Sequence, residues 1–303
     1  MANGRRKEHD RRRTIVQLLV AVVSNVYIVG FLEGRIYRGG AKALCVPGLN
    51  CYACPGALGS CPIGSLQAVI GSRDKIFSWY VGGFLITVGA TMGRFVCGWL
   101  CPFGWLQDLV HRIPIPKSWK RKRRIPGEKY VSLLRYLVLV VFVILLPIYL
   151  VDFVGQGSPY FCSWICPSGT LSGLFLLAGN PGLRSVAGWL FVWKNAILAV
   201  TVLTSIIIYR PFCRYICPLG ALYGLFNPIS LYRLEVNKET CTSCGICQRV
   251  CKLDIPVHTK PNSPACIRCG DCIAACPHGS ISGGFKKATV RTEASGEIAS
   301  DYP

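Results

Sequence analysis

Apolar residues come in long, nearly uninterrupted blocks along this chain, separated by polar, basic or cysteine-rich stretches. A helix of about 20 apolar residues can cross the roughly 30 Å hydrocarbon core of a bilayer. Four blocks are long enough, and they predict membrane-spanning helices at residues 14–32, 78–100, 131–151 and 186–209. A soluble domain would have to bury all four blocks in one small core, and the blocks lack the apolar and polar periodicity that such a core requires.

The segments between the blocks predict the rest of the architecture. Segments 33–77 and 152–185 form two loops on one side of the membrane. The second loop contains a short apolar stretch, 171–178, which is a candidate re-entrant segment. We therefore predict a membrane α protein with a four-helix transmembrane domain (1–230), a small cysteine-rich α+β domain (231–284) and a disordered tail (285–303).

The formal net charge of +20 comes from basic residues that flank the apolar blocks. They form no stripe interleaved with aromatic residues, so we predict no nucleic-acid partner. By the positive-inside rule, the basic segments before the first block and after the second are cytoplasmic, and four crossings then place both termini in the cytoplasm. This predicts a multi-pass protein of the inner membrane, whose first helix is retained because no small-residue cleavage site follows it. The basic residues concerned are Arg5, Arg6, Lys7, Arg11, Arg12, Arg13, Arg112, Lys117, Lys120, Arg121, Lys122, Arg123, Arg124 and Lys129.

Two runs of cysteines near the C-terminus have the spacing Cys-x2-Cys-x2-Cys-x3-Cys. In bacterial ferredoxins the first three cysteines of such a run hold one 4Fe-4S cluster, and the fourth belongs to the other cluster. Zinc ribbons also contain Cys-x2-Cys pairs, but they have no reason to repeat the triple twice. We predict two 4Fe-4S clusters, one held by Cys241, Cys244, Cys247 and Cys276, the other by Cys266, Cys269, Cys272 and Cys251.

A second motif, Cys-x3-Cys-Pro, occurs three times, within a Cys-Pro-x-Gly-x-Leu frame that starts at Cys61, Cys101, Cys166 and Cys217. The four copies suggest two duplicated helical hairpins. Proline is favoured at the first position of a helix, so each of these cysteines is expected to cap a helix N-terminus, where the helix dipole stabilises a thiolate or an anionic cluster.

A third 4Fe-4S cluster is therefore predicted on the cytoplasmic face, held by Cys97, Cys101, Cys213 and Cys217. The alternative is that these are free cysteines buried at close helix contacts. A fourth cluster is predicted on the outer face, held by Cys61, Cys162 and Cys166 with either Cys51 or Cys54. Disulfides among these cysteines and Cys45 compete with this interpretation, because outer loops can face an oxidising compartment.

Other cofactors are less well supported by the residues. The four histidines lie outside the predicted spans and no Cys-x-x-Cys-His occurs, so haem is not predicted. Gln107, Asp108 and His111 form a polar group just after Cys101, and they are a candidate site for a quinone head group. Solvated polar residues at a membrane interface would give the same pattern.

The run Arg94-Phe95-Val96-Cys97-Gly98-Trp99-Leu100-Cys101-Pro102, its partner at Cys213 to Pro218 and the ferredoxin motif resemble the NapH, MauN and NosR type of ferredoxin-like membrane protein. The resemblance covers about the first 280 residues. It implies four transmembrane helices, cytoplasmic clusters, and electron exchange between a cytoplasmic or quinol donor and an extracytoplasmic redox partner. The chain departs from the NosR type in lacking its large flavin-bearing N-terminal region, and it has additional outer cysteines.

Three functions are compatible with these features. The first is a transmembrane electron conduit that belongs to a larger complex, with membrane lipid around it and redox partner proteins on one or both sides. The second is the membrane subunit of a quinol dehydrogenase, which would oxidise quinol itself. The third is an assembly factor that supplies electrons for the maturation of another metalloprotein. Quinol-dependent cluster reduction would distinguish the second function from the first.

Overall fold

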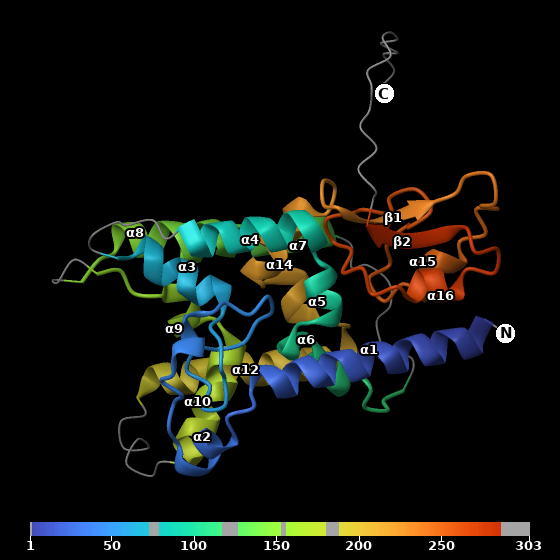
Figure 1. The fold of residues 1–303 in the computed structure, drawn as a ribbon. Coiled ribbons are helices and arrows are strands. Elements are labelled where there is room, and N and C mark those ends of the chain that lie inside the picture. Colours follow the sequence, from blue (N-terminus) through green and yellow to red (C-terminus); the bar gives the residue numbers. More distant parts are fainter. Residues whose placement is uncertain (1, 73–78, 117–126, 153–155, 180–187, 286–303) are drawn as a thin grey trace, which may run out of the picture.

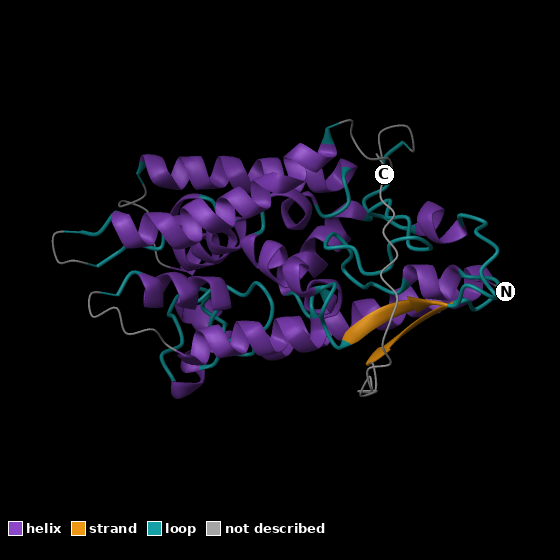
Figure 2. Ribbon diagram, turned by 90° about the horizontal axis from the view of Figure 1, so that it is seen from above, coloured by secondary structure: helices purple, strands orange, loops and turns teal. Residues whose placement is uncertain are grey.

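The computed structural model describes residues 2–72, 79–116, 127–152, 156–179 and 188–285. Long helices lie alongside one another, and a small strand-containing part lies at one end, next to the N-terminus (Figure 1). The view from above places the two strands at the same end (Figure 2). The helices before the strands are α1 (Ala2–Ser24), α2 (Ile28–Glu33), the 3-10 helix η1 (Gly40–Ala43), α3 (Pro62–Ile70), α4 (Trp79–Met92), α5 (Phe95–Trp99), α6 (Pro102–His111), α7 (Glu128–Val138), the π-helix η2 (Leu139–Leu145), α8 (Leu146–Tyr149), α9 (Tyr160–Trp164), α10 (Pro167–Gly179), α12 (Trp189–Ile207), α13 (Pro211–Tyr215) and α14 (Pro218–Phe226).

Two helical segments are long and apolar enough to cross a membrane, among the described residues. One is Tyr130–Tyr149, in which α7, η2 and α8 follow one another without a break, and the other is Trp189–Ile207, which is α12. They correspond to the third and fourth predicted spans. Residue 78 of the second predicted span and residues 186–187 of the fourth lie outside the described residues.

The first two predicted spans do not form single helices of spanning length. The first block is divided, because α1 ends at Ser24 and α2 begins at Ile28. In the second block α4 has 14 residues and ends at Met92, and α5 begins only at Phe95. The four-helix transmembrane bundle is therefore supported for two spans, and the other two stay a prediction.

The chain turns between each long helix and the cysteine that follows it. Gly93 comes directly after α4 with φ +52°, in the left-handed region that commonly ends a helix, and Arg210, the residue before α13, has φ +49°. Each is followed by a one-turn helix that carries a cysteine, α5 with Cys97 and α13 with Cys213. Both cysteines are buried.

The long helices keep large apolar side chains on their outer faces. Leu19 of α1, Leu137 of α7 and Leu203 of α12 are all more than half exposed. Aromatic residues stand at helix ends, with Trp79 82%, Tyr149 76% and Trp189 76% exposed. A surface of this kind is unfavourable in water, whereas lipid-facing leucines with aromatic residues at the interfaces are typical of membrane helices.

The C-terminal part is a small α+β unit with the antiparallel strands β1 (Tyr232–Val236) and β2 (Ile281–Phe285) and the short helices α15 (Ile246–Val250) and α16 (Asp271–Ala275). Leu234 of β1 lies opposite Gly283 of β2 and is 1% exposed. Figure 1 shows this unit beside the first half of α1. The predicted tail lies outside the described residues apart from Phe285.

Candidate iron-sulfur sites

Two cavities in the C-terminal unit each bring together four cysteines. The first ferredoxin cavity is lined by Cys241, Cys244, Cys247 and Cys276, and the second by Cys251, Cys266, Cys269 and Cys272. Each cavity thus has three cysteines from one run and the fourth from the other. This is the crossed arrangement expected from the sequence, although the ligand assignment itself stays a prediction.

The backbone repeats itself between the two cysteine runs. Ser243 and Arg268 are both at φ +52°, and two residues later Gly245 and Gly270 are both at positive φ. Helix α15 follows the first glycine and α16 follows the second. Such turns direct successive backbone N–H groups toward one point, which favours an anionic cluster inside the turn.

The four cysteines of two Cys-x3-Cys-Pro motifs, those at Cys97 and Cys213, also lie close together. We call Cys97, Cys101, Cys213 and Cys217 the inner set; each is 5 or 6% exposed and lies within electrostatic reach of the other three. Cys101 and Cys217 are the N-caps of α6 and α14, as their Cys-Pro sequences predict. Three N–H groups point at sulfur: Leu49 N to Cys101 Sγ at 3.4 Å, Gly220 N to Cys217 Sγ at 3.4 Å, and Gln107 Nε2 to Cys213 Sγ at 3.2 Å.

Two buried arginines cross between the halves of the inner set. Arg94, three residues before Cys97, donates from Nη2 to the carbonyl oxygen of Cys213 at 3.0 Å. Arg210, three residues before Cys213, donates to the carbonyl oxygen of Cys97. Both guanidinium groups are 1% exposed. Positive charge on both sides of the site stabilises thiolates and an anionic cluster.

The remaining contacts of these two arginines differ. Arg210 donates from Nε to Asp108 Oδ1 at 2.7 Å, whereas Arg94 donates to the carbonyl oxygens of Pro264 and Ala265 at 3.0 and 3.1 Å. Burial opposes ionisation of Asp108, but Arg210 and Arg13 nevertheless hold its pKa below the usual range. Arg94 thus ties the inner set to the chain segment just before Cys266.

A corresponding outer set consists of Cys51, Cys61, Cys162 and Cys166. Each of these thiols is within electrostatic reach of others in the set. Gln67 Nε2 lies 3.3 Å from Cys162 Sγ, as Gln107 Nε2 lies near Cys213 Sγ in the inner set. Both glutamines stand six residues after a Cys-Pro cysteine.

Cys51 lies closer than Cys54 to the other thiols of the outer set, and the choice between these two ligands stays a prediction. Gly169, three residues after Cys166, has room for a Cβ only 3.7 Å from Cys51 Sγ. The charge of Cys51, unlike that of Cys54, is among the influences on both Cys162 and Cys166. Cys45 lies apart, with Sγ 3.8 Å from the hydroxyl oxygens of Ser60 and Ser65.

The outer set has a lysine where the inner set has an arginine. Ala57 stands four residues before Cys61, as Cys97 stands four before Cys101. The Lys42 ammonium donates a hydrogen bond to the carbonyl oxygen of Ala57 at 2.7 Å. In the inner set, Arg210 makes the equivalent hydrogen bond to the carbonyl oxygen of Cys97. Lys42 is 6% exposed, so its charge is held inside the protein beside the outer set.

All eighteen cysteines are described, and none forms a disulfide. Burial raises the pKa of Cys213 and of Cys61 to about 12, with nearby thiols contributing in the same direction. Without iron these thiols keep their protons, and a metal replaces the protons when it binds. In the described ranges, no three His, Cys, Asp or Glu side chains converge on a single metal ion. A 4Fe-4S cluster does not require such convergence, because each of its four cysteines binds a different iron atom. Four-thiol groups with N–H donors to sulfur fit 4Fe-4S clusters.

The second ferredoxin cavity is docked directly onto the inner set. Gly98, next to Cys97, packs so closely that a Cβ on it would overlap the carbonyl oxygen of Ile267. Trp99 Nε1 donates to the carbonyl oxygen of Arg268 at 3.1 Å. Both acceptors lie between Cys266 and Cys269, so the segments that carry the two cysteine groups are in direct contact.

Tyr223 lies between the inner and outer sets. It is 0% exposed, and its hydroxyl donates to the carbonyl oxygen of Pro47 at 3.2 Å. Burial raises its pKa, and the nearby Cys97, Cys61 and Cys101 raise it further, which places cysteines of both sets within reach of one ring. No motif in the sequence singles out this residue.

Helix α1 joins the C-terminal unit to the membrane helices through buried charges. Arg13 is 1% exposed and lies 3.6 Å from Asp108 Oδ2 and 3.8 Å from Asp271 Oδ1. Lys252, where ferredoxins often have proline, lies 3.6 Å from Asp271 Oδ2. Gln17 Nε2 donates to the carbonyl oxygen of Gly98 at 2.9 Å. Arg13 therefore has a structural role in addition to the topological one that its position suggests.

The candidate quinone residues all have partners within the protein. Gln107 contacts Cys213, Asp108 pairs with Arg210, and His111 Nδ1 lies 2.9 Å from the carbonyl oxygen of Ser205. Gln107 and Asp108 are buried at 2 and 4% exposure. Their observed contacts support the inner set, and a quinone site there stays a prediction.

Comparisons with known proteins point to the same chemistry. A family model described as a 4Fe-4S binding domain matches residues 76–126, 134–184 and 189–234. Each match contains one Cys-x3-Cys-Pro motif, so the cysteines of the membrane region lie in segments related to 4Fe-4S proteins, and the ferredoxin cysteines lie after the last match. No solved structure matches.

Curated relatives include proteins from archaea and bacteria. The protein MJ0750 of Methanocaldococcus jannaschii is 30% identical over 200 residues, which cover 65% of this chain and 75% of the relative. The ferredoxin-type protein NapH of Haemophilus influenzae is 28% identical, over 59% of this chain and 58% of its own. The methylamine utilization ferredoxin-type protein MauN of Methylorubrum extorquens is 28% identical, over 55% and 50%.

Proposed function

Because this chain belongs to the family of ferredoxin-type 4Fe-4S proteins that includes NapH and MauN, we propose that it carries electrons across a membrane through four 4Fe-4S clusters. Members of this family are electron-transfer proteins, and the repeated matches to a 4Fe-4S domain indicate several clusters. Two would be held in the ferredoxin cavities, the third by the inner set and the fourth by the outer set. The cysteines supply thiolate ligands, and the chemistry is one-electron transfer at iron.

The contacts between the cysteine groups support this proposal. The segment 264–268 of the second ferredoxin cavity rests on Gly98 and Arg94 of the inner set, and Tyr223 connects the inner and outer sets. The first ferredoxin cavity opens to solvent, because Cys244 is exposed. Electrons would pass between a soluble partner at that opening and an acceptor at the outer set, in either direction.

The sidedness is part of the proposal. The C-terminal unit and the basic start of α1 lie at the same end of the helices (Figure 1). The basic segment before the first apolar block favours the cytoplasm for this end. Trp79, Tyr149 and Trp189 begin or end helices and would stand at the opposite interface. The proposed topology is multi-pass in the inner membrane, with both termini cytoplasmic, in a complex with redox partner proteins.

Iron counts on anaerobically purified protein test the cluster number. We expect about sixteen irons and as many acid-labile sulfides per chain. Cys217→Ala and Cys166→Ala should each lose about four irons while the ferredoxin spectra remain. Cys45→Ser is the matched control and should lose none. Full iron in both alanine variants would show that the membrane cysteines are structural.

A further inference from the structure

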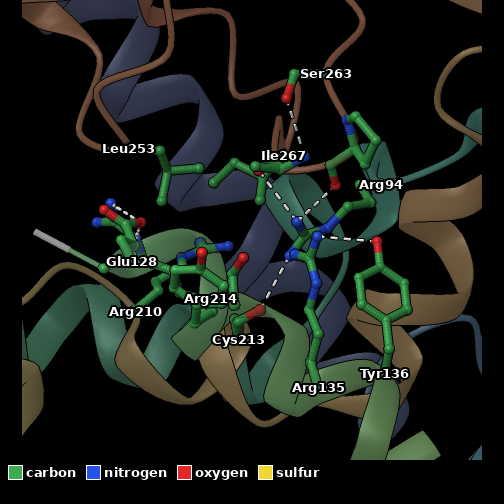
Figure 3. A pocket seen from close by; sticks show the side chains of 15 residues that line it. Arg94, Glu128, Arg135, Tyr136, Arg210, Cys213, Arg214, Leu253, Ser263 and Ile267 are labelled. Carbon is green, nitrogen blue, oxygen red and sulfur yellow. Dashed lines mark hydrogen bonds and ion pairs between the residues drawn. The ribbon is translucent and has the colours of Figure 1, made fainter. Parts of the chain in front are cut away.

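A cavity of about 510 Å³ lies between the start of α7, helix α13 and the 263–267 segment of the C-terminal unit. Figure 3 shows side chains from all three parts meeting around it. Its volume falls within the range of small-ligand sites. None of the cluster assignments above makes use of this space, although Cys213 contributes to its wall.

The lining of the cavity has an excess of positive charge. Arg94, Arg135, Arg210 and Arg214 line it, with Glu128 as the one acidic residue of the lining. Arg210 is paired with Asp108, and Arg214 is paired with Glu128. Neither Arg94 nor Arg135 has an ion pair with a carboxylate among the described residues.

Arg135 is the less well partnered of these two. Its side chain is 4% exposed, and its Nη2 donates a hydrogen bond to the hydroxyl oxygen of Tyr136 at 3.0 Å. Its Nε has no hydrogen-bond partner, and neither has Nε of Arg94. Figure 3 shows the Arg94 and Arg135 guanidinium groups next to each other, and their like charges act on one another.

Two buried guanidinium groups of like charge are unfavourable unless an anion lies near both. The inner cluster would supply negative charge on one side, but it would not fill the cavity or satisfy the two Nε groups. A tetrahedral oxyanion suits a pair of arginines, because each guanidinium can donate two parallel hydrogen bonds to its oxygens.

We propose that this cavity binds a phosphate group, held chiefly by Arg135 and Arg94. The cavity begins at Tyr130, which is 79% exposed and stands at the start of the apolar segment 130–149. That is the level at which lipid head groups meet a membrane helix. The phosphate can therefore belong to an anionic lipid or be free in solution, and the cavity recognises the same chemistry in both.

Binding measurements on the delipidated holoprotein in neutral detergent distinguish these sources. Calorimetry uses inorganic phosphate in one arm, and mixed micelles with phosphatidylglycerol in the other, with phosphatidylcholine micelles as the control. We expect one saturable site per chain. Saturation by phosphate identifies a free anion, and saturation by phosphatidylglycerol alone identifies a lipid. No saturable binding in either arm overturns the proposal.

Three variants test the site itself. Arg135→Gln should weaken binding about tenfold or more, because it removes a charge-assisted donor. Arg11→Gln, which removes one exposed charge from α1, is the matched control and should leave binding unchanged. Glu128→Gln removes the acidic residue of the lining and should tighten binding, so the proposal remains testable if Arg135→Gln fails to retain iron. Equal affinities in the Arg135→Gln and Arg11→Gln proteins, or weaker binding in Glu128→Gln, would contradict it.

Discussion

At the scale of single residues, the inner set is built by side chains that reach across from the other half of the motif pair. Arg94 donates a hydrogen bond to the carbonyl oxygen of Cys213, and Arg210 donates one to the carbonyl oxygen of Cys97. The sequence predicts the four cysteines of this set from their spacing and from the membrane topology. It could not identify the arginines as partners of these carbonyls, because each contact joins residues more than 100 positions apart.

The buried pair of Arg210 and Asp108 gives a stability prediction. Arg210→Gln should lower the free energy of unfolding by about 3 kcal/mol, because it leaves a buried carboxylate without its main partner. Asp108→Asn in the same chain should recover part of this loss. Arg112→Gln breaks an exposed pair with Asp10 and should cost less than about 1 kcal/mol. Denaturant unfolding in detergent measures all four proteins, and equal stabilities of Arg210→Gln and Arg112→Gln would contradict the account.

At the scale of elements, the sequence predicts where helices begin better than where they end. Proline after Cys61, Cys101 and Cys217 fixes the starts of α3, α6 and α14, and the structure confirms all three. The end of α4 at Met92 was not predicted, because the apolar block continues past it. Gly93 in the left-handed conformation ends the helix, and a tertiary contact fixes the turn, because the Asn227 side chain accepts a hydrogen bond from Arg94 N at 2.9 Å.

The contact of α5 with the C-terminal unit gives a prediction about electron transfer. Gly98→Ala would push a methyl group into the carbonyl of Ile267 and separate the second ferredoxin cavity from the inner set. The inner cluster should then be reduced more slowly from the ferredoxin side, with the iron content unchanged. Gly83→Ala in α4, where a Cβ meets nothing within 4 Å, is the control. Freeze-quench spectra of the clusters after mixing with a reductant measure the rate, and an unchanged rate in Gly98→Ala would show that this contact does not couple the clusters.

At the scale of the whole molecule, the account depends on which end of the helices faces the cytoplasm. Cys45 lies in the predicted outer loop 33–77, is partly exposed and belongs to none of the four cysteine groups, so its thiol is a suitable probe. A membrane-impermeant maleimide added to intact cells should label wild-type protein and not Cys45→Ser. Labelling that requires permeabilised cells would reverse the proposed orientation.

The order of the cysteine groups along the molecule is the central claim. In proteoliposomes with a trapped one-electron acceptor, an impermeant reductant added outside should reduce the acceptor through the holoprotein. The Cys217→Ala protein should keep its ferredoxin spectra and lose this transfer, because the path is broken at the inner set. Transfer at the wild-type rate through Cys217→Ala, or no transfer through the iron-replete wild type, would contradict the proposed path across the membrane.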